Sequence, residues 1–317
     1  MSYSNDMKNE LIRIIPSDET DRVSLLAGIV RTNGTILIGS GQRIGLQVVS
    51  ENAAVARGVY SLMKTLFHVE AELTIGRQTR LNKRAVYVLD VPAQQRMAVL
   101  LRSLGMVDEE GLLFNTDISQ DLVSRDPQRR AYLRGVFLGS GSMTAPHRSY
   151  HLEIVTQREQ YAENLISLIN NYNIYPRMSF RRDNVVVYLK ECEQISDFLA
   201  LIGAHDALMI FENTRIQKGM RNQVNRIVNC ETANLNKAVD AAQRQIAAIR
   251  KLEAHMGLGR LPSSLKEAAQ ARLAYPELSL KELGESMEPP VGKSGMNHRM
   301  RRIEELAEEL EIKENQK

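Results

Sequence analysis

Two segments of the sequence are rich in Lys and Arg and contain no Asp or Glu. Their side chains are suited to binding phosphate groups. The first run is TRIQKGMRNQVNR, residues 214–226, and the second is VGKSGMNHRMRR, residues 291–302. Their basic members are Arg215, Lys218, Arg221 and Arg226 in the first run and Lys293, Arg299, Arg301 and Arg302 in the second. The net charge of the chain is only +3, so clustering rather than total charge indicates nucleic acid. A solvated charged face is the alternative for either run alone.

Two short helices are predicted around the second basic run. LSLKELGESM opens one of them with the spacing of a capping box, at Ser279 and Glu282. EPPVG cannot remain helical, and another helix is predicted from about Ser294. Helices joined by a Pro-Gly break, with the small Gly284 in the first, are typical of a helix-turn-helix, whose second helix enters the major groove. The predicted motif covers residues 278–311, and an ordinary helical hairpin is the alternative.

The side chains that open this second helix are of kinds that read DNA, since Arg pairs with guanine and Asn with adenine. The candidate DNA-binding residues are Lys293, Ser294, Asn297, His298, Arg299, Arg301 and Arg302. Glutamates begin only at Glu304, where the helix would leave the groove, and phosphates would repel acids placed earlier. Met296 and Met300 are expected on the buried face of the helix.

The segment before this motif is predicted to be mainly helical. A long helix is expected from about Arg226 to Gly257. It is followed by a shorter helix in SSLKEAAQARLAYP, where Ser264 and Glu267 have capping-box spacing. The basic run 214–226 contains no element that would enter a groove. Its four basic residues, Arg215, Lys218, Arg221 and Arg226, are therefore expected to contact the DNA backbone only.

The N-terminal two thirds of the chain contain an internal repeat. LLAGIVRTNGTI (25–36) aligns with YLRGVFLGSGSM (132–143), and both copies have two glycines six residues apart. Each copy continues with strand, helix, two strands and a closing helix, an order that predicts pseudo-two-fold symmetry. Glycines on a helix that faces a partner let the two backbones approach closely. Gly28, Gly34, Gly135 and Gly141 are therefore the candidate residues for packing of the helix pair.

The paired strings LLAGIVRTNG and YLRGVFLGSG resemble the LAGLIDADG motifs of the homing endonucleases. That resemblance implies a four-stranded saddle in each half, with a concave face that can lie along DNA. The C-terminal string NRIVNCETANL extends the similarity, so the chain resembles the WhiA family of bacterial sporulation and cell-division regulators over nearly its whole length. The expected fold class is α+β, a pseudo-two-fold LAGLIDADG-like αββαββα repeat followed by an all-α helix-turn-helix domain.

The resemblance also decides what chemistry to expect. In the endonucleases each motif supplies an acid just before its final glycine, and the two acids hold divalent metal at the scissile phosphates. The matching positions here are Asn33 and Ser140, both neutral, and no acid lies within residues 22–50 or 127–152. Because Mg²⁺ prefers carboxylate ligands, the sequence predicts no catalytic metal and no nuclease or other enzyme activity.

Other classes of function find little support. Cys192 and Cys230 give no disulfide framework and no paired metal-ligand spacing, and they favour a reducing cytosol. No phosphate-binding or dinucleotide fingerprint is present, and the six histidines are scattered. A serine nucleophile at Ser140 or Ser142, with His147 or His151 nearby in sequence, is supported by no elbow motif and no oriented acid. We expect no metal, no cofactor, no small-molecule substrate and no membrane span.

These observations divide the chain and suggest its function. The expected domains are an N-terminal helical lead-in (1–19), a first repeat (20–106), a connector (107–126), a second repeat (127–213), a basic linker (214–228), a helix-turn-helix domain (229–312) and a tail (313–317). The predicted partner is double-stranded DNA, bound in a sequence-specific way. The WhiA resemblance implies a cytoplasmic, nucleoid-associated regulator of transcription linked to cell division, chromosome segregation and sporulation. An active endonuclease, and a scaffold whose N-terminal saddle binds a protein partner, are the alternatives.

Overall fold

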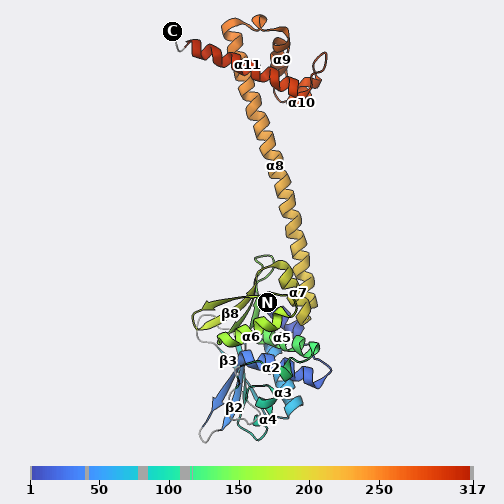
Figure 1. Ribbon diagram of the computed structural model, residues 1–317, viewed down its shortest axis with the longest axis vertical. Coiled ribbons are helices and arrows are strands. Elements are labelled where there is room, and N and C mark those ends of the chain that lie inside the picture. Colours follow the sequence, from blue (N-terminus) through green and yellow to red (C-terminus); the bar gives the residue numbers. More distant parts are fainter. Residues whose placement is uncertain (1, 40–42, 78–84, 108–114, 116, 315–317) are drawn as a thin grey trace. The chain divides into compact units, whose positions relative to one another are not determined.

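The structure, a computed structural model, describes residues 2–39, 43–77, 85–107, 115 and 117–314. These residues form two compact units, with the boundary between Lys218 and Gly219. The first unit is α+β and the second is entirely helical (Figure 1). No helix in these described ranges is long and apolar enough to cross a membrane.

The first unit contains the predicted repeat, preceded by the short helix α1 (Tyr3–Leu11). The first copy consists of α2 (Glu19–Asn33), β1 (Gly34–Ile38), β2 (Ile44–Ser50), α3 (Ala53–Phe67), β3 (Glu72–Arg77), β4 (Ala85–Val91) and α4 (Met97–Ser103). The second copy consists of α5 (Asp126–Ser140), β5 (Gly141–Met143), β6 (Leu152–Thr156), α6 (Glu159–Asn170), β7 (Arg177–Arg181), β8 (Asn184–Leu189) and α7 (Cys192–Ile202). A 3-10 turn, η2 (Gln120–Leu122), lies between them. The predicted fold class and element order are confirmed.

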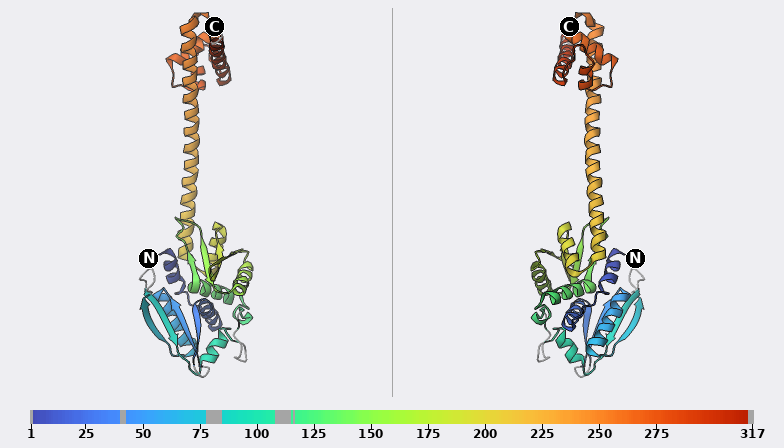
Figure 2. Two further views of the ribbon diagram at one scale, coloured as in Figure 1. Left: turned by 90° about the vertical axis from the view of Figure 1, so that its left-hand side faces the viewer. Right: turned by 90° about the vertical axis from the view of Figure 1, so that its right-hand side faces the viewer.

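Each copy forms a four-stranded antiparallel sheet with the same strand order, β1-β2-β4-β3 and β5-β6-β8-β7. The registers also correspond, since Gly34 pairs with Val48 and Gly141 pairs with Ile154. One face of each sheet is apolar and buried under helices, as the alternating burial of β6 illustrates. In Figure 2 the two repeats are seen as two lobes, blue to cyan and green to yellow.

Helices α2 and α5 pack directly against each other at the centre of this unit, through their backbones. A Cβ atom placed on Gly28 would lie 2.8 Å from the Val136 nitrogen, and one placed on Gly135 would lie 3.1 Å from the Ile29 nitrogen. Neither distance leaves room for a side chain. Gly139, which the sequence pattern did not single out, has the same role, because its Cβ would lie 3.1 Å from the Ile29 carbonyl oxygen.

Gly34 and Gly141 do not take part in this contact, and their prediction as helix-pair residues is wrong. Each is the residue that follows its own helix, with extended backbone angles, and each begins a strand. An added Cβ would meet the preceding turn of the same helix, 2.8 Å from Val30 Cγ1 at Gly34 and 2.7 Å from Phe137 Cγ at Gly141. These glycines allow an abrupt change from helix to strand.

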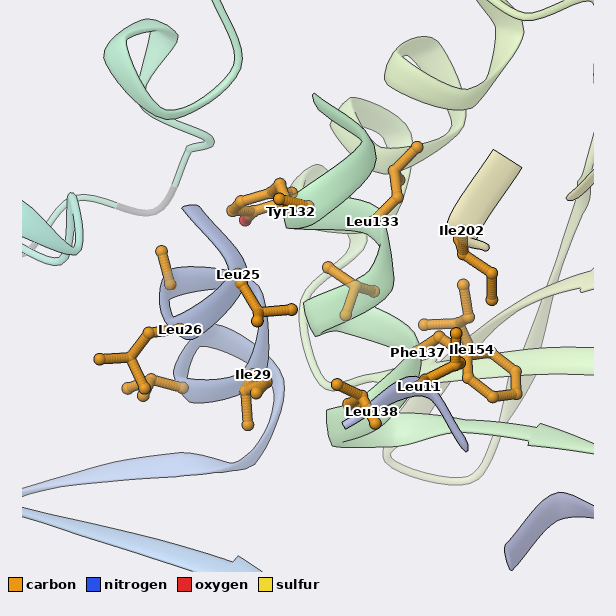
Figure 3. Close-up of a cluster of buried hydrophobic side chains, with 14 of the residues drawn as sticks. Leu11, Leu25, Leu26, Ile29, Tyr132, Leu133, Phe137, Leu138, Ile154 and Ile202 are labelled. Carbon is orange, nitrogen blue, oxygen red and sulfur yellow. The ribbon is translucent and has the colours of Figure 1, made fainter. Parts of the chain in front are cut away.

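A single apolar core surrounds the helix pair. Leu25 and Ile29 from α2 and Leu133 and Phe137 from α5 are fully buried in it (Figure 3). Helix α1 joins the same core through Leu11. The core is therefore shared by both repeats and is not divided between them.

The second unit is built from α8 (His205–Met256), which begins in the first unit, and from a helical cluster. That cluster comprises η3 (Leu258–Arg260), α9 (Ser263–Ala274), α10 (Leu280–Glu285) and α11 (Lys293–Glu314). The long helix predicted from about Arg226 thus begins 21 residues earlier, at His205. The predicted basic linker 214–228 lies wholly inside α8, so both of its boundaries fall within one helix.

One predicted helix cap is also corrected. Helix α9 begins at Ser263 with Pro262 as its N-cap, and no side chain caps it. The capping box expected from Ser264 and Glu267 is therefore absent, because Ser264 already lies inside the helix.

We expect Gly28→Leu or Gly135→Leu to destabilise the first unit, because the added side chain would enter the space of the partner backbone. Overpacking of this kind typically costs about 1–3 kcal/mol, and occasionally more. Scanning calorimetry of the full chain would measure it. Gly219→Leu is the matched control, since nothing lies within 4 Å of that position. Unchanged melting of both core variants would contradict the proposed contact.

Candidate nucleic-acid interface

The turn between α10 and α11 is held by local hydrogen bonds that the sequence encodes. Ser279 Oγ accepts a hydrogen bond from the Glu282 backbone N–H at 3.3 Å, and a Glu282 carboxylate oxygen accepts one from the Ser279 N–H at 2.9 Å. The predicted capping box is therefore present. Further on, the Gly284 carbonyl accepts the Val291 N–H at 2.9 Å. A Cβ on Gly284 would lie 3.1 Å from the Val291 carbonyl carbon. The backbone at Val291 can therefore pass this close to α10 only because residue 284 is glycine.

Helix α11 is fixed by a narrow apolar face. Met296, Met300 and Ile303 are fully buried, and they pack with Ile249 and Leu283 in the core of the second unit. The intervals of four and three residues keep these side chains on one side of the helix. The prediction that the two methionines form the buried face is confirmed.

The opposite side of α11 faces solvent. At about 100° per residue, the side chains of Ser294, Asn297, His298 and Arg301 lie away from the buried face, and all four are exposed. Among the described residues, the side chains of Asn297 and His298 make no hydrogen bond to the protein. We call these four residues the outward face. Lys293, also exposed, is the first residue of the helix.

Two of the predicted reading arginines are bonded to other groups of the second unit. Arg299 is half-buried beside the core, and its Nη1 donates to the Ser264 carbonyl oxygen at 3.3 Å. Arg302 Nη1 donates to a Glu305 carboxylate oxygen at 2.9 Å and lies 3.5 Å from a Glu309 carboxylate oxygen. This hydrogen bond to the Glu305 carboxylate raises the pKa of Arg302 above its usual value. Arg299 and Arg302 are therefore engaged within the second unit, Arg299 beside the core and the exposed Arg302 with glutamates of the next turns of its own helix.

The basic residues on α8 also divide into two kinds. Arg215 pairs with Glu212 at 3.2 Å. Lys218 Nζ donates to the Pro146 carbonyl oxygen at 2.7 Å and lies 4.7 Å from the centre of the Tyr150 ring. Both are therefore used inside the first unit. Arg221 and Arg226 are exposed on α8.

The ends of α2 and α5 meet in a cleft of about 1330 Å³, which Asn33 and Ser140 both line. The Asn33 side-chain amide donates to the Val49 carbonyl oxygen at 2.8 Å. An ammonium group enters the same region, because Lys8 Nζ donates to the Gly139 carbonyl oxygen at 3.3 Å. Burial lowers the pKa of Lys8 to about 8, and the charge of Glu51 opposes this shift.

This arrangement is poorly suited to a divalent cation. A carboxylate pair would attract the ion, whereas two neutral side chains and a nearby ammonium would not. Within the described part of the chain, no three His, Cys, Asp or Glu side chains gather as metal ligands would.

The arrangement around Ser142 is equally unlike a nucleophile site. Ser142 Oγ donates to a carboxylate oxygen of Glu153 at 3.3 Å, and His151 lies 3.1 Å from the other oxygen of the same carboxylate. Ser142 and His151 are both hydrogen-bonded to the Glu153 carboxylate, and the structure gives no hydrogen bond between the serine and the histidine.

Comparison with known proteins gives one consistent result. Residues 19–107 match the family described as the WhiA N-terminal LAGLIDADG-like domain, residues 129–221 the WhiA LAGLIDADG-like domain, and residues 224–307 the WhiA C-terminal HTH domain. The chain is 48% identical over 310 residues to the "Probable cell division protein WhiA" of Desulforamulus reducens, covering 98% of this chain and 96% of that protein. It is 46% identical over 312 residues to the protein of the same name from Clostridium tetani, covering 98% of each.

A solved structure agrees over the same length. The crystal structure of full-length DUF199/WhiA from Thermatoga maritima is 25% identical in sequence and superposes with a TM-score of 0.60, covering 98% of this chain and 99% of that one. The similarity therefore extends through both units.

We expect Gly284→Ala to destabilise the second unit by about 1–3 kcal/mol, because the methyl group would push against the Val291 backbone and displace the start of α11. Calorimetric unfolding of the full chain would measure the change. Gly292→Ala is the control, since nothing lies within 4 Å of that position and it belongs to the same turn. Equal effects of the two substitutions would show that the turn does not depend on close approach at Gly284.

Proposed function

The chain belongs to the WhiA family, and from that premise we propose that it is a sequence-specific DNA-binding protein that reads its site with the outward face of α11. The observation that carries this proposal is the composition of that face. Asn297, His298 and Arg301 project from a helix whose opposite side is locked by Met296 and Met300. Asn and Arg side chains can discriminate base edges in the major groove.

The distribution of charge along α11 supports the same use. No acid occurs between Pro290 and Arg302, and glutamates follow from Glu304 onward. A helix that enters a groove by its N-terminal turns needs an acid-free start, since phosphates repel carboxylates. The bonds of Arg302 to Glu305 and Glu309 are consistent with a helix that is leaving the groove there.

We further propose that DNA binding serves the regulation of transcription linked to cell division and chromosome segregation and, where the organism sporulates, to sporulation. The names of the relatives support the connection with cell division. Action on DNA implies a cytoplasmic, nucleoid-associated protein.

For the first unit we propose a binding saddle without nuclease activity. Its support is the chemistry of the cleft, where Asn33 and Ser140 replace acids and Lys8 adds a positive charge. The saddle either follows the DNA backbone or binds a protein partner. If a variant that is altered only in the second unit binds random DNA with full affinity, the saddle would be the part that follows the DNA backbone.

The outward face and the α8 basic residues should act differently on DNA. We expect Asn297→Ala or Arg301→Ala to cost about 1–3 kcal/mol on the specific site and little on random sequence. Neutralising Arg221 and Arg226 together should weaken binding to the specific site and to random DNA equally. It should also reduce the slope of log affinity against log salt concentration by about one unit per charge. Fluorescence titrations at two salt concentrations, on a site selected from a randomised duplex pool, would measure both effects.

A matched control is Arg302, which is exposed as Arg301 is but is ion-paired within its own helix. Arg302→Ala should leave the ratio of specific to random affinity nearly unchanged, because its guanidinium is held by two glutamates. If Arg302→Ala collapses that ratio and Arg301→Ala does not, the assignment of the outward face is wrong. Uniform loss in every α11 variant would move specificity to the saddle.

The protein should not cut DNA in the presence of Mg²⁺ or Mn²⁺. The reason is the absence of paired carboxylates where a two-metal mechanism would need them. Incubation of supercoiled and linear DNA carrying the selected site with each metal would test this. Specific, metal-dependent nicking that is lost in an Asn33→Ala variant would overturn the proposal.

A further inference from the structure

The cleft at the ends of α2 and α5 contains an ammonium group that the protein neutralises only in part. Lys8 Nζ donates to the Gly139 carbonyl oxygen at 3.3 Å. An ammonium has three N–H donors, and this carbonyl is the one acceptor that the described residues give it. Burial lowers the pKa of Lys8 to about 8, and the charge of Glu51 opposes this shift without removing it. Because buried charges are normally paired, such a group would bind an anion.

Helix α1 holds Lys8 in place from both repeats. In the first repeat, the side-chain amide of Asn52 donates to Asn5 Oδ1 at 2.7 Å. In the second repeat, the Met143 backbone N–H donates to Ser4 Oγ at 3.4 Å. The C-terminal end of α5 carries partial negative charge, which stabilises the ammonium beside the last turn of that helix. Lys8 is therefore a fixed part of the cleft.

The rest of the lining is suited to phosphate. Among the described residues that line the cleft, Lys8, Arg31 and Arg158 are basic and Glu51 alone is acidic. Arg158 is exposed, and its guanidinium makes no hydrogen bond within the described part of the chain. Ser140 lines the same cleft, and its hydroxyl is buried without a hydrogen-bond partner. Ammonium, guanidinium and hydroxyl groups are donors that bind phosphate oxygens.

Lys8 is also the basic group of the cleft that can change its charge near neutral pH. Helices α3 and α5 and strand β5, which pack against α1, contribute no titratable side chain to the described lining. Two phenols belong to it, Tyr87 from β4 and Tyr161 from α6, and burial raises the pKa of Tyr161 well above its usual value. The two arginines stay protonated, since a guanidinium does not lose its charge in this range.

From these observations we infer that the cleft is a phosphate-binding site in which the Lys8 ammonium is the principal contact. The phosphate belongs either to the backbone of duplex DNA or to a small phosphorylated molecule, and a volume of about 1330 Å³ admits both. The inference rests on the proposed binding saddle and names the group that the saddle binds. It does not depend on the reading of bases by α11.

The first test measures the affinity of the full chain for random duplex DNA and for ATP at pH 7 and pH 9, without divalent metal. The native chain should lose up to about tenfold in affinity for the phosphate that it binds. The reason is that a lysine with a pKa of about 8 is only about one-tenth protonated at pH 9. Lys8→Arg should keep its affinity at pH 9, because arginine remains charged.

The second test removes the charge at constant pH. Lys8→Met should weaken binding of the phosphate ligand about tenfold at pH 7, since a hydrogen bond from a charged donor is lost. On random DNA it should also reduce the slope of log affinity against log salt concentration by about one unit. Lys64→Met is the matched control and should change neither, because Lys64 is exposed on α3 and does not line the cleft.

The outcomes separate the two sources of phosphate and the two proposals. An effect of Lys8→Met on DNA binding supports the backbone as the source, and an effect on ATP binding supports a small phosphorylated molecule. The ratio of specific to random DNA affinity should stay unchanged in Lys8→Met, so failure here leaves reading by α11 intact. Unchanged affinity of Lys8→Met for both ligands would overturn the inference. A loss at pH 9 that persists in Lys8→Arg would also overturn it, because another group, such as the amino terminus of the chain, would then be the one that titrates.

Discussion

The contact between the backbones of α2 and α5 is the constraint on which the rest of the first unit depends. Gly28, Gly135 and Gly139 remove the side chains that would separate the two helices. Strand β1 begins at Gly34, the residue after α2, and strand β5 begins at Gly141, the residue after α5. Fixing the helices therefore fixes the first strand of each sheet, and antiparallel pairing then orders the remaining strands.

The same constraint explains why the cleft persists without the acids of the endonuclease motif. The geometry of the helix ends is set by packing several residues away, so Asn33 and Ser140 are brought together whatever their chemistry. Packing and catalysis are thus separable in this fold. The neutral Asn33 is accommodated at its helix end by donating to the Val49 carbonyl oxygen.

Much of this architecture could be predicted from the sequence because it is repeated. Two copies of helix, two strands, helix, two strands and helix left little freedom in the fold class, and the registers of the two sheets agree. The roles of the glycines could be predicted only in part. Gly34 and Gly141 occupy matching positions exactly as Gly28 and Gly135 do, and sequence alignment alone cannot separate a glycine between helices from one at a helix end. The repeat did not identify Gly139, because the matching residue of the first copy is Thr32 and not glycine. The Thr32 side chain occupies the space that a Cβ on Gly139 would enter.

The second unit shows where prediction from composition stops. The motif around Ser279 and Glu282 could be predicted because its hydrogen bonds are local. The extent of α8 could not, because Lys218 is held to the rest of the first unit by contacts with Pro146 and Tyr150, which are distant in sequence.

The partners that each basic residue finds within the fold, rather than membership of a basic run, decide what it can do. Arg301 and Arg302 are neighbours in sequence, yet about 100° of rotation separates them. Both are exposed, but Arg302 is ion-paired with the glutamates of the next turns. The acid-free run that suggested DNA binding therefore contains residues of two kinds on one helix. Residues of the outward face are exposed, while Arg302 ties the basic N-terminal turns to the acidic turns that follow. On α8 the same rule separates Arg221, which is exposed, from Lys218, which is bound within the first unit.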